Sequence, residues 1–148
     1  MDKKNNELSK ITIEMISITQ KLAICNKQNC QPFTNKTIKD GIELASKLNK
    51  LTKISIKNKK QYETIFKEHF QKQTVIDYQK CVYKNCKDIY FTLISVFLNL
   101  FEALSVSFED LIEVKQLKKI LSKKTKTYND FKKSQEYFLI LNMFLKNK

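Results

Sequence analysis

The four cysteines of the chain fall into two six-residue segments with the same pattern. Cys25-Asn-Lys-Gln-Asn-Cys30 and Cys81-Val-Tyr-Lys-Asn-Cys86 each place two cysteines five positions apart, with an asparagine directly before the second. Two equal pairs indicate that the cysteines meet each other or share one ligand. The pattern constrains the fold because it would join two parts of the chain that are far apart in the sequence.

Helix geometry limits how the pairs can close. Within an intact α-helix, residues five apart are separated by about 7.5 Å of rise and about 140° of rotation. A disulfide needs Cα atoms about 4.4 to 6.8 Å apart. The two cysteines of one segment can therefore form a disulfide with each other only if the helix ends inside that segment. The alternative is a crosswise arrangement between antiparallel segments, with Cys25 bonded to Cys86 and Cys30 bonded to Cys81. Each crosswise bridge would contribute about 4 kcal/mol through loop entropy.

Zinc bound by four cysteine thiolates is the metal alternative, because two pairs supply enough ligands for a tetrahedral site. Structural zinc pairs are usually spaced more closely, in a turn that contains glycine, and neither segment has one. Unpaired thiols buried as small apolar side chains are the third interpretation. The sequence favours disulfides and leaves the other two open, so we predict no cofactor other than a zinc ion at these cysteines.

Length and hydrophobic content predict one globular domain, residues 1–148. The 148 residues are 42% hydrophobic and include ten phenylalanines. A chain of this length buries about two-thirds of the surface that it exposes when unfolded. Neither a metal nor a disulfide is therefore required merely for folding.

Apolar residues recur every three or four positions in several segments, which is typical of amphipathic helices. The first stripe is formed by Leu8, Ile11, Met15, Ile18, Leu22 and Cys25. Residues 26–36 contain the only proline, Pro32, and are predicted to form a loop or a helix stop, with Cys30 just beyond the helix. Further helices are predicted at 37–51, 59–80, 111–121 and 129–146, with 52–56 as helix or coil. The predicted fold is all-α, a single compact bundle of about five or six helices.

Residues 89–108 are long and apolar enough to need a separate decision. Glu102 is their only charged residue, and their length matches the hydrocarbon core of a bilayer. Asn99 and Glu102 lie inside the segment, and residues 105–110 resemble a helix cap that divides it. A buried core helix is the favoured interpretation. A membrane-anchored protein spanning 89–108 is the third functional hypothesis.

The charge of the chain comes entirely from lysine. All 28 basic residues are lysine, and with 15 acidic residues they give a net charge of +13. In residues 115–133 the only acidic residue is Asp130. The lysines of this first cluster are Lys115, Lys118, Lys119, Lys123, Lys124, Lys126, Lys132 and Lys133. A second, acid-free cluster comprises Lys50, Lys53, Lys57, Lys59 and Lys60. Such clusters attract phosphate without reading bases. They predict sequence-independent nucleic-acid binding as the alternative function, and the codon bias of an AT-rich genome is the competing explanation.

No catalytic motif is present. Gly41 is the only glycine, which excludes a P-loop and a Gly-x-Gly dinucleotide turn. His69 is the only histidine, and no recognisable nucleophile signature accompanies it. We expect a partly buried histidine with its hydrogen bonds satisfied. The prediction is a protein without enzymatic activity or a small-molecule substrate.

The two cysteine segments, in a background rich in lysine, asparagine and isoleucine, resemble small uncharacterised proteins of AT-rich large DNA viruses. Such viruses often encode their own thiol oxidation machinery, so the resemblance implies disulfides in a particle assembled in the cytoplasm. No secretory signal is visible near the N-terminus, which predicts an intracellular protein, with a virion as one oxidising niche.

The predicted function is that of a non-catalytic structural or protein-interaction protein, such as a minor component of a virion or a complex. Its predicted partner is another protein or a second copy of the chain. Nonspecific nucleic acid is the alternative partner, and a membrane is the less favoured one.

Overall fold

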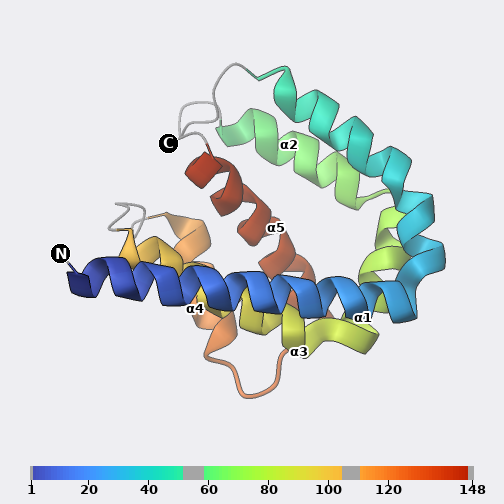
Figure 1. The fold of residues 1–148 in the computed structure, drawn as a ribbon. Coiled ribbons are helices and arrows are strands. Elements are labelled where there is room, and N and C mark those ends of the chain that lie inside the picture. Colours follow the sequence, from blue (N-terminus) through green and yellow to red (C-terminus); the bar gives the residue numbers. More distant parts are fainter. Residues whose placement is uncertain (1, 52–58, 105–110, 147–148) are drawn as a thin grey trace.

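The computed structural model describes residues 2–51, 59–104 and 111–146. Within these ranges the chain forms five helices and no strand (Figure 1). They are α1 (Asp2–Asn49), α2 (Lys59–Phe70), α3 (Gln73–Ala103), α4 (Ile112–Leu121) and α5 (Tyr128–Lys146). The prediction of an all-α bundle of about five or six helices is confirmed.

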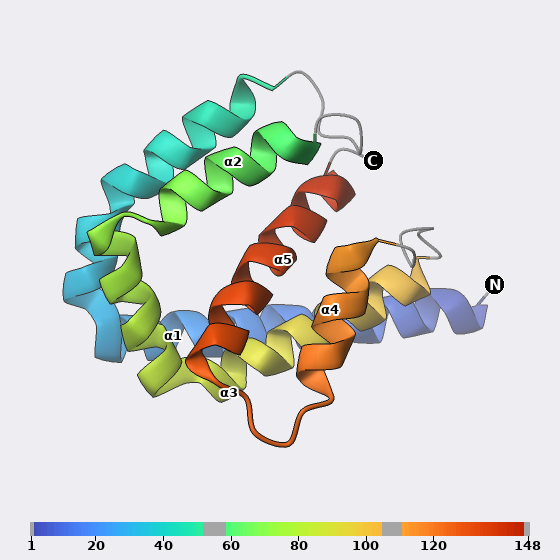
Figure 2. The ribbon, with the colours of Figure 1, turned by 180° about the vertical axis from the view of Figure 1, so that it is seen from behind.

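The long helix α3 lies in the middle of the bundle. The first half of α1 runs antiparallel to it on one side, and the second half of α1 continues beside α2 (Figure 1). Seen from behind, α4 and α5 lie on the opposite side of α3 from the first half of α1 (Figure 2). The first half of α1 is therefore an outer layer. One side of this half packs against α3, and the other side of α1 is uncovered.

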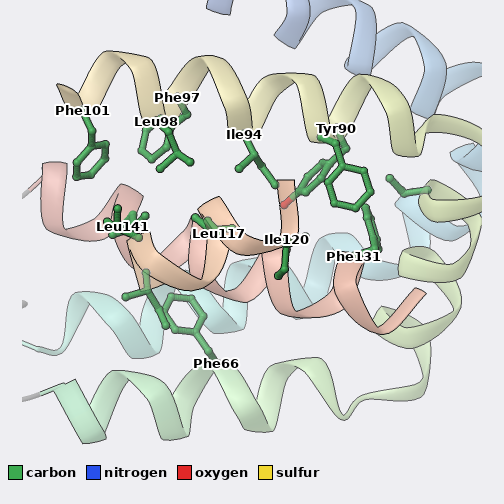
Figure 3. Packing of buried hydrophobic residues seen from close by; sticks show 14 of the residues in the cluster. Phe66, Tyr90, Ile94, Phe97, Leu98, Phe101, Leu117, Ile120, Phe131 and Leu141 are labelled. Carbon is green, nitrogen blue, oxygen red and sulfur yellow. The ribbon is translucent and has the colours of Figure 1, made fainter. Parts of the chain in front are cut away.

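The core lies between α3 and the pair formed by α4 and α5, and seven of the nineteen buried residues of its main cluster are aromatic (Figure 3). The Phe97 ring meets the rings of Phe138 and Phe101 at centroid distances of 4.7 and 5.0 Å, and Tyr90 meets Phe131 at 5.0 Å. All three pairs are edge-to-face, the arrangement that the ring quadrupole favours. Aromatic packing thus joins α3 to α5.

The apolar segment that begins at residue 89 forms part of this core as far as the structure describes it. Its buried side chains on α3 are Tyr90, Phe91, Leu93, Ile94, Val96, Phe97, Leu98 and Phe101. The favoured prediction of a core helix is confirmed for residues 89–103, and residues 105–108 lie outside the described ranges. Of the five helices described, none combines the length and apolar character needed to cross a membrane.

The predicted loop at 26–36 is wrong, because α1 continues through it with a kink. Cys30 alone has non-helical dihedrals, with φ −125° and ψ 15°. Pro32 then lies in the first turn after the kink, where its missing N–H would have no helical partner. The Thr34 hydroxyl also donates to the Cys30 carbonyl oxygen at 2.9 Å. Pro32 therefore begins the second half of α1 instead of stopping the helix, and Cys30 lies at the kink instead of beyond the end of a helix.

A second difference is the break between α2 and α3. The predicted helix at 59–80 stops at Phe70, and α3 begins at Gln73 and continues through both Cys81 and Cys86. Lys72 at the junction is extended, with φ −68° and ψ 135°. Its ammonium lies 2.7 Å from Glu43 and 3.4 Å from Asp40, both on α1. Contacts with a distant helix accompany this break, and no glycine or proline marks it in the sequence.

The last two helices match the predicted segments closely. A capping box defines the start of α5: the Asp130 N–H donates to Thr127 Oγ1 at 3.1 Å, and the Thr127 N–H donates to Asp130 Oδ2 at 2.9 Å. The Thr127 N–H, followed by the Lys123 ammonium, holds the pKa of the Asp130 carboxyl below its ordinary value. The two hydrogen bonds of the capping box satisfy backbone N–H groups at the start of α5, which explains why the helix begins directly after a polar connector.

Candidate functional site

The two cysteine segments lie beside each other on α1 and α3. Cys25 is bonded to Cys86 with a Cα–Cα distance of 6.1 Å, and Cys30 is bonded to Cys81 at 5.9 Å. This is the crosswise arrangement, made feasible by the antiparallel course of the two helices. All four sulfurs are in disulfides, so the structure contains no cysteine thiolate that could bind zinc. Of the three interpretations, it supports the disulfides.

The asparagine shared by both segments braces the cross-links. Asn29 Nδ2 donates to the Cys25 carbonyl oxygen at 2.9 Å and lies 3.6 Å from Cys25 Sγ. Asn85 makes the same contacts with Cys81, at 2.9 and 3.5 Å. Each asparagine thus holds the first cysteine of its own segment from one helical turn further along. Neither asparagine was among the predicted site residues, although their matched positions were the available signal.

Each disulfide joins one buried cysteine to one partly exposed cysteine. Cys30 and Cys86 are 0% and 2% exposed, whereas Cys25 and Cys81 are half-buried. An external thiol can attack only the accessible sulfur and must expel the other as a thiolate. Burial disfavours that thiolate. Both bridges are therefore protected from reduction in the folded protein, as structural disulfides are.

Large apolar side chains exposed to solvent are concentrated on α1. Within the described residues, five of the seven lie on this helix: Ile13, Ile16, Ile24, Ile38 and Ile42. On the opposite side of the first half, Ile18 is buried against Leu93 and Val96 of α3. The helix therefore has two apolar faces, of which only one is covered. The second face was missed because one stripe was already enough to assign the helix.

The first three of these residues lie on one side of α1, here called the isoleucine face: Ile13, Ile16 and Ile24, with exposed fractions of 68%, 54% and 56%. The exposed Ser17 and Gln20 lie between Ile16 and Ile24. The spacing of the three isoleucines places them on the side of α1 that points away from α3. Cys25 follows directly after Ile24, so a disulfide anchors the helix next to this face. The isoleucine face is exposed, apolar and fixed to the body of the protein.

The predicted nucleic-acid-binding lysines lie on α4, on the connector and on the first turns of α5. Lys126 is half-buried and the other seven are exposed. Lys115, Lys118 and Lys119 share one exposed face of α4. Lys123 pairs with Asp130 at 2.9 Å, and it alone of the eight forms an ion pair within the described residues. Most of this cluster therefore presents uncompensated charge to solvent.

The second lysine cluster is not acid-free in three dimensions. Lys59 Nζ lies 2.5 Å from Glu113 Oε1 of α4, a carboxylate that is only 1% exposed, and 3.8 Å from Glu63. Lys53 and Lys57 lie outside the described residues. The prediction that this cluster lacks acidic neighbours is wrong for Lys59, whose charge joins α2 to α4.

His69 lies where the second half of α1 meets α2. It is partly buried as predicted, but its Nδ1 has no hydrogen-bond partner among the described residues. Burial, followed by the nearby Lys72 ammonium, lowers the pKa of this imidazole below its ordinary value. Within the described ranges no group of three or more His, Cys, Asp and Glu side chains is arranged to hold a metal ion. We assign His69 no chemical role.

The geometry thus consists of a disulfide-braced helix pair, an exposed isoleucine face and a lysine cluster. A scan against protein-family models finds no match to the chain, and searches of curated proteins and of solved structures find none either.

Proposed function

We propose that the chain is a non-catalytic structural protein that associates with a second copy of itself through the isoleucine face of α1. The observation that carries this proposal is the exposure of Ile13, Ile16 and Ile24 on a helix that two disulfides fix in place. Exposed apolar surface of this kind is stabilised when a partner removes it from water. A fixed helix also loses little conformational freedom on binding.

The charges beside the isoleucine face favour a second copy in antiparallel orientation. Glu14 and Lys21 are both exposed and lie two helical turns apart on one side of α1. In an antiparallel pair whose two-fold axis passes between them, Glu14 of each copy lies opposite Lys21 of the other. The isoleucine face is centred on the same part of the helix. One arrangement therefore brings the isoleucine faces of the two copies together and pairs Glu14 with Lys21.

The disulfides support a location in which thiols become oxidised. Stable bridges are rare where glutathione and thioredoxin keep cysteines reduced. A virion or another oxidising niche fits a protein whose two long helices are joined by covalent bonds. Self-association on a rigid helix face suits a minor structural component of such a particle or complex.

Sedimentation velocity over a range of protein concentrations tests this proposal. We expect a concentration-dependent dimer that Ile13→Glu with Ile24→Glu converts to a monomer. The chain carries +13, and salt screens repulsion between copies beyond about 8 Å at physiological ionic strength. Dimerisation should therefore strengthen as sodium chloride is added.

Two controls make the result specific. Ile112 on α4 is also 60% exposed, and Ile112→Glu should leave the dimer intact. Glu14→Lys alone should weaken the dimer, and adding Lys21→Glu should restore it. A wild-type protein that stays monomeric at every concentration and salt would contradict the proposal, as would an Ile112→Glu variant that dissociates equally.

Sequence-independent nucleic-acid binding is the second candidate function, favoured by the exposed lysine face of α4. We expect the protein to be retained on nonspecific duplex DNA at low salt. Lys115→Gln with Lys118→Gln should reduce the slope of log affinity against log salt by about 2, because each phosphate contact contributes about 0.9. The matched variant, Lys36→Gln with Lys39→Gln on α1, should leave the slope unchanged. Absence of retention at low salt would exclude this function.

A further inference from the structure

A pocket of about 390 Å³ lies between α3 and the connector that joins α4 to α5. The connector forms the open loop that passes beside α3 (Figures 1 and 2). Side chains from both elements line the pocket, among them Lys87, Asp88, Phe91, Lys124, Thr125 and Lys126. Two segments that are distant in the sequence thus bring three lysines to one concave site.

Contacts inside the protein position two of the three ammonium groups. Lys87 Nζ lies 5.0 Å from the ring centroid of Tyr83. Lys126 Nζ lies 5.6 Å from the ring centroid of Phe91 and donates to the Lys123 carbonyl oxygen at 3.0 Å. Cation–π contacts and a backbone hydrogen bond restrict these otherwise flexible side chains. Less conformational entropy is then lost when they bind an anion.

The charges at the pocket are unbalanced. Lys87, Lys124 and Lys126 form no ion pair with any described residue, and Asp88 is the only carboxylate in the lining. Three ammonium groups and one carboxylate leave a net charge of +2. A phosphate monoester is mostly a dianion at neutral pH, because its second pKa is about 6, and free phosphate becomes a dianion at slightly alkaline pH. Its oxygens accept hydrogen bonds from ammonium groups and from a hydroxyl such as that of Thr125.

We propose that this pocket binds a terminal phosphate group, either free phosphate or a phosphate monoester. The dianion matches the net charge of the lining, whereas a backbone phosphodiester carries one charge. The site is independent of the isoleucine face, which lies on the uncovered side of α1. The pocket also differs from the lysine face of α4, because its Lys87 lies on α3 and belongs neither to that face nor to the isoleucine face.

Binding of inorganic phosphate, followed by isothermal titration calorimetry at constant ionic strength, tests the pocket. We expect saturable binding that Lys87→Gln with Lys124→Gln weakens by about tenfold or more, because hydrogen bonds to charged groups are the stronger ones. Lys36→Gln with Lys39→Gln removes the same charge from exposed positions on α1 and should leave the affinity unchanged. Equal losses in both variants, or no saturable binding, would overturn the assignment.

A short oligonucleotide with and without a 5′-phosphate distinguishes the two sources of phosphate. We expect the 5′-phosphorylated strand to compete with inorganic phosphate more strongly than the 5′-hydroxyl strand, and Lys87→Gln with Lys124→Gln to abolish that difference. Failure of both strands to compete would identify free phosphate as the ligand, whereas equally strong competition by both strands would overturn the assignment to a terminal phosphate. Retention of duplex DNA that depends on Lys115 and Lys118 is a separate result and leaves this comparison unchanged.

Discussion

Removal of one disulfide, by replacing Cys25 and Cys86 with alanine, is expected to lower the free energy of unfolding by about 3 kcal/mol, and removal of both by about 7 kcal/mol. The cysteines that each bridge joins are 61 and 51 residues apart. Either bridge alone closes a long loop in the unfolded chain and contributes about 4 kcal/mol. Once one is closed, the other closes a loop of only about 12 residues and adds about 3 kcal/mol.

Urea unfolding followed by circular dichroism measures these losses. Replacing Cys30 and Cys81 should cost about as much as replacing Cys25 and Cys86, because each change leaves one long loop closed. In a thermal scan, loss of one bridge should lower the melting temperature by about 10 °C. Intact mass before and after reduction in denaturant should differ by four hydrogen atoms. Equal stability of the wild type and the four-alanine variant, or an unchanged mass, would contradict the disulfide assignment.

Replacement of Lys59 by methionine is expected to destabilise the protein by about 3 kcal/mol, because it leaves the Glu113 carboxylate buried without a counter-charge. Lys59 Nζ lies 2.5 Å from Glu113 Oε1. The other carboxylate oxygen of Glu113 has no hydrogen-bond partner among the described residues. Burial, followed by the negative charge of Glu113, raises the pKa of Tyr62.

The same lysine offers a matched control. Glu63 lies 3.8 Å from Lys59 Nζ but is 41% exposed, so Glu63→Gln should cost less than about 1 kcal/mol. Lys59→Met combined with Glu113→Leu should regain much of the lost stability, because it replaces both charges with apolar groups. The prediction fails if the Lys59→Met and Glu63→Gln proteins unfold at the same urea concentration.

Helices with local periodicity could be predicted from the sequence, and breaks that accompany distant contacts could not. The stripe from Leu8 to Cys25 and the helices α4 and α5 follow from apolar spacing alone. The kink at Cys30 and the junction at Lys72 involve partners on another helix, namely Cys81 and the carboxylates of Asp40 and Glu43. Local sequence carries no record of those partners.

For the candidate site, too, the sequence predicted the local geometry but not the contacts between distant segments. The geometry of a five-residue step restricted the cysteine pairs to local or crosswise closure. The choice among disulfide, zinc and thiol depended on how α1 and α3 pack, which spacing does not specify. The contact between Lys59 and Glu113 and the pocket beside Lys87 likewise join segments that the sequence shows only as separate.

The Cys25–Cys86 bond also determines how the molecule would carry a mechanical load. Tension applied between the two ends of the chain passes from α1 into α3 at this bond, because a covalent link is the shortest path between them. Residues 26–85, which include the kink, the second half of α1 and all of α2, lie inside the closed loop and bear none of that tension. Unless the bond breaks, stretching can lengthen only the segments before Cys25 and after Cys86.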